Sequence, residues 1–124
     1  MATYSKHLLS QSLSGIGIHV TSMNPIAPTT FHISGLGHTN FDEVYVYGTN
    51  NTSTSVTLTA IWGLSAWEHL PNMQNSQGNV LTIPANTRMV VMNGRLIQNG
   101  LSACAYTSVN NAVVLDGYIN RITA

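Results

Sequence analysis

The amino-acid sequence predicts an all-β fold, an antiparallel β-sandwich or jelly roll of about eight or nine strands. Short runs in which apolar and polar residues alternate recur along the chain, and Gly, Asn and Pro separate them. The sequence has no internal repeat, no heptad pattern and no sustained helical periodicity. With 124 residues, of which 44% are hydrophobic, the chain is long enough for one domain with a sizeable core.

The predicted strands follow the alternating runs in order. They cover residues 16–21, 29–34, 41–47, 54–62, 80–83, 87–92, 101–107 and 112–122. The run 41–47 has apolar residues on both faces, Val44 and Val46 on one and Phe41, Tyr45 and Tyr47 on the other. Alternation is clearest in 54–62, with Val56, Leu58, Ala60 and Trp62 opposite Ser55, Thr57 and Thr59. Strand 54–62 is therefore predicted to have one dry face and one wet face.

Asparagines mark the predicted turns. The Asn-Gly pair at 99–100 is a strong hairpin signal, because both residue types tolerate positive φ, and the pair at 93–94 is a second one. Residues 50–53 and 110–111 are also predicted to turn the chain.

The chain divides into two predicted parts. Residues 15–124 are expected to form a single β-sandwich domain with a long loop at 63–79. Loops of that length are uncommon and often functional. Residues 1–14 are expected to be an N-terminal arm that becomes ordered only on docking, as chain ends often do.

The charged fraction of the chain is unusually small. It is 6%, against about 25% for ordinary soluble domains, and the net charge is zero. The charged residues are Lys6, Asp42, Glu43, Glu68, Arg88, Arg95, Asp116 and Arg121. Low net charge favours association, and the surface polarity comes from Ser, Thr and Asn instead. This composition favours a surface that packs against other protein, and it excludes intrinsic disorder.

Several classes of protein fit the sequence poorly. The single cysteine, Cys104, cannot form an internal disulfide and is predicted to be a core residue. We expect neither a signal peptide nor a membrane span, so the protein is expected to be cytosolic when it is made. A sequence pI near 7.0 and the absence of a basic stripe argue against nucleic-acid binding.

No catalytic, cofactor or metal site is predicted. The five histidines, His7, His19, His32, His38 and His69, lack the close spacing of a zinc site. The Asp42-Glu43 pair is interpreted as edge-protecting charge at a strand start, not as an acid and base. No serine or cysteine lies in a nucleophile-elbow motif. The sequence therefore predicts that the protein is not an enzyme.

The aromatic residue of the long loop has two interpretations. Trp67 could stack on a sugar ring, as in carbohydrate-binding modules, or anchor a protein interface. We favour the interface, because large aromatic side chains bury much area at low entropy cost. The residues predicted to lie in interfaces are Tyr4, Leu8, Leu9, Trp67, His69 and Met73.

Several segments resemble a family of small virion proteins of tailed bacteriophages. They are Leu81–Asn86, Met89–Val91, Leu96–Leu101, Ala103, Ala105–Tyr106, Asn111–Leu115 and Gly117–Ile122, together with Asp42–Tyr47, Asn50–Ser53 and Val56–Thr59. The family includes capsid decoration, or cement, proteins, notably of phages of cyanobacteria and marine bacteria. Residues 64–79 depart from the family pattern, and no catalytic residues are implied by the resemblance.

The resemblance implies a β-sandwich on the exterior of the virion capsid, present in the host cytoplasm during assembly. Its implied partner is the major capsid protein, whose lattice it would bind and stabilise. A symmetric homo-oligomer, a dimer or trimer, is also expected. Two alternatives remain open: a carbohydrate-binding module of a head or tail fibre, and a ring component of the head–tail junction or tail.

Overall fold

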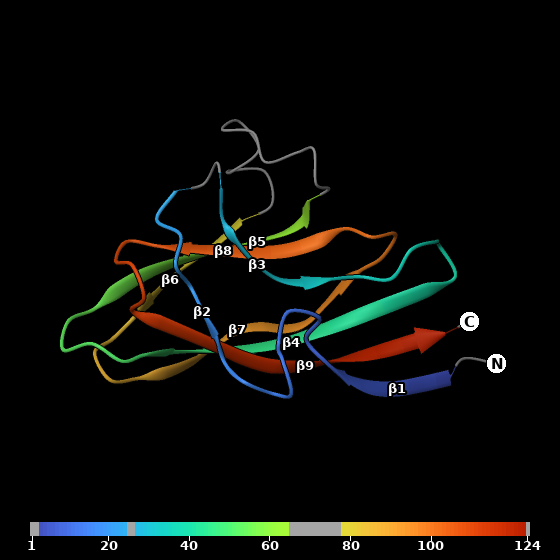
Figure 1. The fold of residues 1–124 in the computed structure, drawn as a ribbon, viewed down its shortest axis with the longest axis horizontal. Coiled ribbons are helices and arrows are strands. Elements are labelled where there is room, and N and C mark those ends of the chain that lie inside the picture. Colours follow the sequence, from blue (N-terminus) through green and yellow to red (C-terminus); the bar gives the residue numbers. More distant parts are fainter. Residues whose placement is uncertain (1–2, 25–26, 65–77, 124) are drawn as a thin grey trace.

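The computed structural model describes residues 3–24, 27–64 and 78–123, and these form two antiparallel β-sheets stacked face to face (Figure 1). The all-β prediction is confirmed. The strands are β1 (Thr3–Leu8), β2 (Ile18–His19), β3 (Thr29–Ile33), β4 (Asn40–Asn50), β5 (Val56–Leu64), β6 (Gly78–Ile83), β7 (Arg88–Ile97), β8 (Ser102–Thr107) and β9 (Val113–Thr123).

The strand order is that of a jelly roll. We call the sheet with the order β1-β9-β4-β7 sheet A; β2 pairs with β9 beyond the end of β1. Sheet B has the order β3-β8-β5-β6. The pairs β2·β9, β3·β8, β4·β7 and β5·β6 are those of one long antiparallel ribbon. Rolling that ribbon adds the pairs β4·β9 and β5·β8 and divides it into two packed sheets.

The core lies between the sheets and follows from the period-two alternation of the strands. In β4, Val44 and Val46 are fully buried, whereas Phe41, Tyr45 and Tyr47 lie on the opposite face, as predicted. The inner faces of both sheets supply the remaining core side chains, among them Phe31, Val56, Leu58, Ala60, Ile83, Val113, Leu115 and Ile119.

The outer face of β5 differs from its prediction as a wet face. Thr57 is exposed, but Thr59 is only 7% exposed. Ile61 and the predicted core residue Cys104 are buried, and with Tyr106 they form a second, small apolar cluster. On the outer face of β5, the two threonines Thr57 and Thr59 are followed by the apolar residue Ile61.

The two Asn-Gly pairs adopt different local structures, a turn and a β-bulge. Asn99 and Gly100 turn the chain with φ of 62° and 74°, as predicted, but the turn joins β7 of sheet A to β8 of sheet B and closes no hairpin. Asn93-Gly94 does not turn the chain. Gly94, with φ of 84°, is the extra residue of a β-bulge inside β7, because Val44 pairs with Arg95 and Tyr45 with Asn93.

The N-terminal segment, which is expected to be an arm, contains a strand. Residues 3–8 form β1, which pairs antiparallel with residues 118–123 of β9. All six side chains of β1 are exposed, whereas the next residue, Leu9, is only 1% exposed and belongs to the core. The exposed edge of β9 explains the strand, since its backbone groups need partners there.

The predicted long loop at 63–79 begins and ends in strands. Leu64 closes β5 and Gly78 opens β6. Residues 65–77 lie outside the described residues.

Candidate interface on the outer face of sheet A

The outer face of sheet A carries an unusual number of aromatic and aliphatic side chains. Strand register places them in rows across the sheet. Tyr4 pairs with Ile122, which also pairs with Phe41. In another row Leu8 pairs with Tyr118, which also pairs with Tyr45. We call this surface the aromatic face: Tyr4, Leu8, Phe41, Tyr45, Tyr47, Val90, Leu96, Tyr118 and Ile122.

The aromatic face combines exposed apolar side chains with one pair of stacked rings. Tyr4 is 68% exposed and Phe41 37%, although both are large apolar side chains. Tyr45 and Tyr118 stack with their ring centroids 5.0 Å apart. Gly117 allows this close approach of β4 and β9, because a Cβ there would collide with the backbone oxygen of Tyr45. Large aromatic residues on a fixed backbone lose little entropy when a partner covers them.

Each charge on the aromatic face already has a partner within the chain. Arg88 and Asp116 form an ion pair at 2.9 Å, and the Arg88 guanidinium lies over the Tyr47 ring. The Lys6 Nζ lies 4.5 Å from the centroid of the Tyr118 ring. These contacts lower the desolvation cost of covering the face, since a charge that keeps its partner is cheaper to bury.

The fourth charge of the face, Glu43, is held by hydrogen bonds. The Tyr45 hydroxyl donates to Glu43 Oε1 at 2.9 Å, and Asn120 Nδ2 donates to the same oxygen at 3.4 Å. The bond to Glu43 raises the pKa of Tyr45 above its ordinary value.

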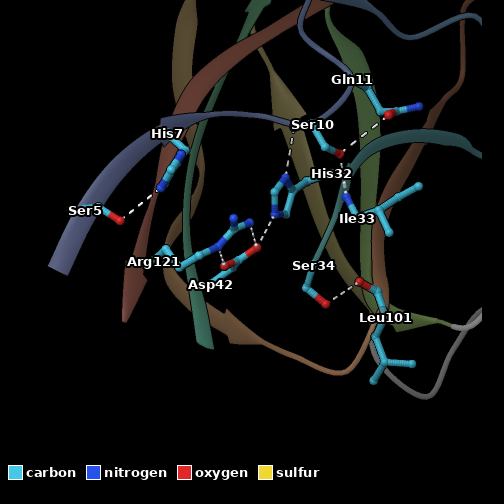
Figure 2. Close-up of polar contacts among 10 residues, drawn as sticks. All are labelled: Ser5, His7, Ser10, Gln11, His32, Ile33, Ser34, Asp42, Leu101 and Arg121. Carbon is cyan, nitrogen blue, oxygen red and sulfur yellow. Dashed lines mark hydrogen bonds and ion pairs between the residues drawn. The ribbon is translucent and has the colours of Figure 1, made fainter. Parts of the chain in front are cut away.

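A buried polar cluster links β3 of sheet B to β4 and β9 of sheet A (Figure 2). His32 of β3 and Asp42 of β4 are each only 1% exposed. His32 Nε2 lies 2.8 Å from Asp42 Oδ2, and Arg121 of β9 donates to both Asp42 oxygens, at 2.8 and 3.0 Å. On the other side of the ring, the backbone N–H of Ser10 donates to His32 Nδ1 at 3.0 Å. The cluster therefore joins β3, β4 and β9 to the segment that follows β1.

These bonds define the protonation states of the cluster. Because Nδ1 accepts the Ser10 amide, the proton of the His32 ring sits on Nε2 and is donated to Asp42. Burial lowers the pKa of His32 below its ordinary value, although Asp42 acts in the opposite direction. Burial alone would raise the pKa of Asp42, but the hydrogen bonds from Arg121 and His32 outweigh it and lower that pKa.

The geometry of the cluster fits a structural role, in which its hydrogen bonds hold neighbouring strands together. The Ser10 hydroxyl does not contact the histidine ring; it accepts the backbone N–H of Ile33 at 2.7 Å. A serine that a histidine activates must have its hydroxyl hydrogen-bonded to a ring nitrogen. Here the backbone N–H of Ser10, not its hydroxyl, is bonded to His32 Nδ1. Among the described residues, no group of three or more His, Cys, Asp or Glu is placed to hold a metal ion.

The structure brings together only part of the predicted interface. Tyr4 and Leu8 lie on the aromatic face. Leu9 lies in the core instead, because the chain turns inward after β1. Trp67, His69 and Met73 lie outside the described residues.

Most of the aromatic face was not predicted as a site. The apolar residues on both faces of 41–47 could have indicated the aromatic face. A strand with one face in the core needs no aromatic residues on the other, so such residues suggest that a partner covers them. Tyr118 was harder to find, since only the pairing of β9 with β4 places it beside Tyr45.

The fold and this face define the protein as an antiparallel jelly-roll β-sandwich with an apolar, aromatic outer surface. No family model matches the chain, and no curated protein matches it. In the part of the chain that the structure describes, there is no helix that could span a membrane.

Two solved structures resemble the fold distantly. The first, of Bacillus endospore appendages described as disulfide-linked pili, has 7% identity and a TM-score of 0.47, and the match covers 98% of this chain and 86% of that one. The second, a Glycosylation Associate Protein (Gap123) complex from Streptococcus agalactiae, has 8% identity and a TM-score of 0.37. That match covers 98% of this chain but 26% of the other. Neither similarity assigns a family or a function.

Proposed function

We propose that the protein is a structural virion component, a phage capsid decoration protein that binds and stabilises the lattice of the major capsid protein through its aromatic face. The observation that carries the proposal is the concentration of exposed and half-buried aromatic and aliphatic side chains on one outer sheet face. Apolar side chains gathered on one exposed face often mark interaction sites, and here the row of Lys6, Asn120 and Glu43 lies between two apolar rows. In this function the protein performs no catalysis.

The charges of the chain support a lattice contact. A docked face must lose its water, and unpaired charges would make that loss expensive. On the aromatic face Lys6, Glu43, Arg88 and Asp116 keep their own partners, so a covering protein need not supply any. Contacts of this type depend weakly on salt, because ion pairs across the interface contribute little.

Many copies on one shell would make modest single contacts sufficient. Symmetry repeats each contact across the lattice, and linked binding events reinforce one another. The same argument explains a symmetric homo-oligomer, because a dimer or trimer engages more than one lattice site at a time.

The test is rebinding of the purified protein to expanded capsids of the parent phage that lack it. Wild-type protein is expected to co-sediment with the shells and to raise their thermal stability. Leu8→Lys and Phe41→Lys place a new charge at separate positions on the aromatic face, and each is expected to weaken binding at least about tenfold.

Val80→Lys is the matched control. Val80 is 64% exposed, and it lies on β6, the edge strand of sheet B. Its variant should bind like wild type. Failure of the wild-type protein to bind, or equal binding by all three variants, would overturn the proposal.

The number of copies of the protein per virion distinguishes a decoration protein from a ring component. Decoration of a lattice requires on the order of hundreds of copies per particle, whereas a ring at the head–tail junction or tail requires about a dozen or fewer. Quantitative mass spectrometry of purified virions measures this ratio, and the lower number would contradict the proposal.

A further inference from the structure

A groove opens where the edges of the two sheets meet, beside β7. Its volume is about 640 Å³, within the range of small-molecule sites. Trp62 of β5 and Asn79 of β6 line it from sheet B, and residues 90–96 of β7 line it from sheet A. The groove is separate from the buried polar cluster and touches the aromatic face only at Val90 and Leu96.

Arg95 occupies a position where a core residue would be expected. It pairs with Val44, which is fully buried, so it stands at an inner-face position of β7. The bulge at Gly94 bends the strand beside it. Arg95 is nevertheless exposed, and its guanidinium lies 4.0 Å from the centroid of the Trp62 ring. Stacking on the ring therefore favours a position of the guanidinium at the groove.

The partners of Arg95 set it apart from the other arginines. Arg88 pairs with Asp116, and Arg121 pairs with Asp42. Among the described residues, no carboxylate and no hydrogen-bond acceptor contacts the Arg95 guanidinium. Its five N–H donors form a planar fork that matches a carboxylate. In a chain with so few charges, such a group in a groove favours an anionic ligand.

The rest of the lining favours a ligand rich in hydroxyl groups. Asn79 and Asn93 are exposed at the groove, and each amide offers both donors and an acceptor. Gly94, the extra residue of the bulge, also lines the groove. We propose that this groove binds an acidic saccharide, with the ligand carboxylate on Arg95 and its hydroxyls on the two asparagine amides.

The experiment is isothermal titration calorimetry with two matched pairs of probes. The first pair is hexagalacturonate and its fully methyl-esterified form; the second is sialyllactose and lactose. Wild-type protein is expected to bind at least one acidic probe and neither neutral one, with affinity that falls as salt is added. Arg95→Gln should weaken binding at least about tenfold, because it removes a charge-assisted, bidentate contact.

Two further variants distinguish a loss of ligand binding from a loss of folding. Asn93→Asp leaves Arg95 in place but adds a negative charge at the groove, and it should weaken binding of the acidic probe. Arg88→Gln removes an arginine of the same strand outside the groove lining and should bind like wild type. The proposal is overturned if neither acidic probe binds, if the neutral partner binds equally well, or if Arg95→Gln binds like wild type. None of these outcomes depends on capsid binding.

Discussion

At the scale of single residues, the buried cluster joins three strands through bonds among His32, Asp42 and Arg121. His32 accepts at Nδ1 from Ser10 and donates at Nε2 to Asp42, so its neutral form satisfies both neighbours. Arg121 supplies the positive charge that the buried carboxylate requires. From the sequence, Asp42 is predicted to be an edge charge. It instead points into the molecule, because its register against Arg121 and Ile97 places it on the inner face.

Replacing the buried carboxylate should be costly. Asp42→Asn leaves the Arg121 guanidinium without its counter-charge in a partly buried setting, and it should lower the free energy of unfolding by about 3 kcal/mol. Asp116→Asn breaks an exposed ion pair and should change the free energy by less than about 1 kcal/mol. Urea denaturation at neutral pH measures both, and equal effects would contradict the account.

Acid should destabilise the protein through His32 before it does so through Asp42. Because the pKa of folded His32 lies below its ordinary value of 6.5, the unfolded chain takes up a proton there that the folded chain does not. Stability conferred by this residue is therefore present above pH 6.5 and is lost as the pH falls below it. The pKa of Asp42 is likewise lowered, from 3.8, so its contribution is lost only in stronger acid.

His32→Gln tests this pH dependence. Glutamine can still donate to Asp42 but cannot titrate, so the slope of the unfolding free energy just below pH 6.5 should decrease by up to about 1.4 kcal/mol per pH unit. The slope is the relevant quantity, since the variant also loses the acceptor for Ser10. An unchanged slope would assign the effect to another histidine.

At the scale of elements, the boundary between β1 and the core lies between two adjacent leucines. Leu8 is 51% exposed on the aromatic face, and Leu9 is 1% exposed in the core. Residues this alike in sequence cannot be assigned to surface or core from spacing alone. The assignment depends on where β9 offers an unpaired edge, which is a long-range property.

Alanine variants of the two leucines should separate their roles. Leu9→Ala leaves a cavity in the core and should cost about 2–4 kcal/mol of unfolding free energy. Leu8→Ala should cost less than about 1 kcal/mol, because its side chain is half exposed. Thermal or urea denaturation gives both values. A large cost for Leu8→Ala would mean that β1 packs more tightly than described.

Strand positions were largely predictable, whereas their connections were not. Local alternation located most strands, and β4 and β5 follow it over most of their length. The pair Asn93-Gly94 has the same composition as the pair that turns the chain, yet it forms a bulge. The difference lies in its pairing with β4, which continues past the bulge and holds the strand in the sheet.

At the scale of the whole molecule, the jelly roll makes a functional surface from residues that are far apart in sequence. The aromatic face combines β1, β4, β7 and β9, and it becomes a surface only because β4 and β9 pair along eleven residues. Composition predicted that the protein packs against others, but it could not say which face does so. The groove at Arg95 was also not predicted, because it forms between strands of different sheets.

An electron cryomicroscopy reconstruction of the intact phage particle would show where the protein binds. We expect copies of the jelly roll across the shell, with Tyr4, Phe41 and the stacked pair Tyr45–Tyr118 against the major capsid protein. Sheet B should face away from the shell. Density for the protein only at the tail or portal, or a docked orientation with the aromatic face in solvent, would contradict this expectation.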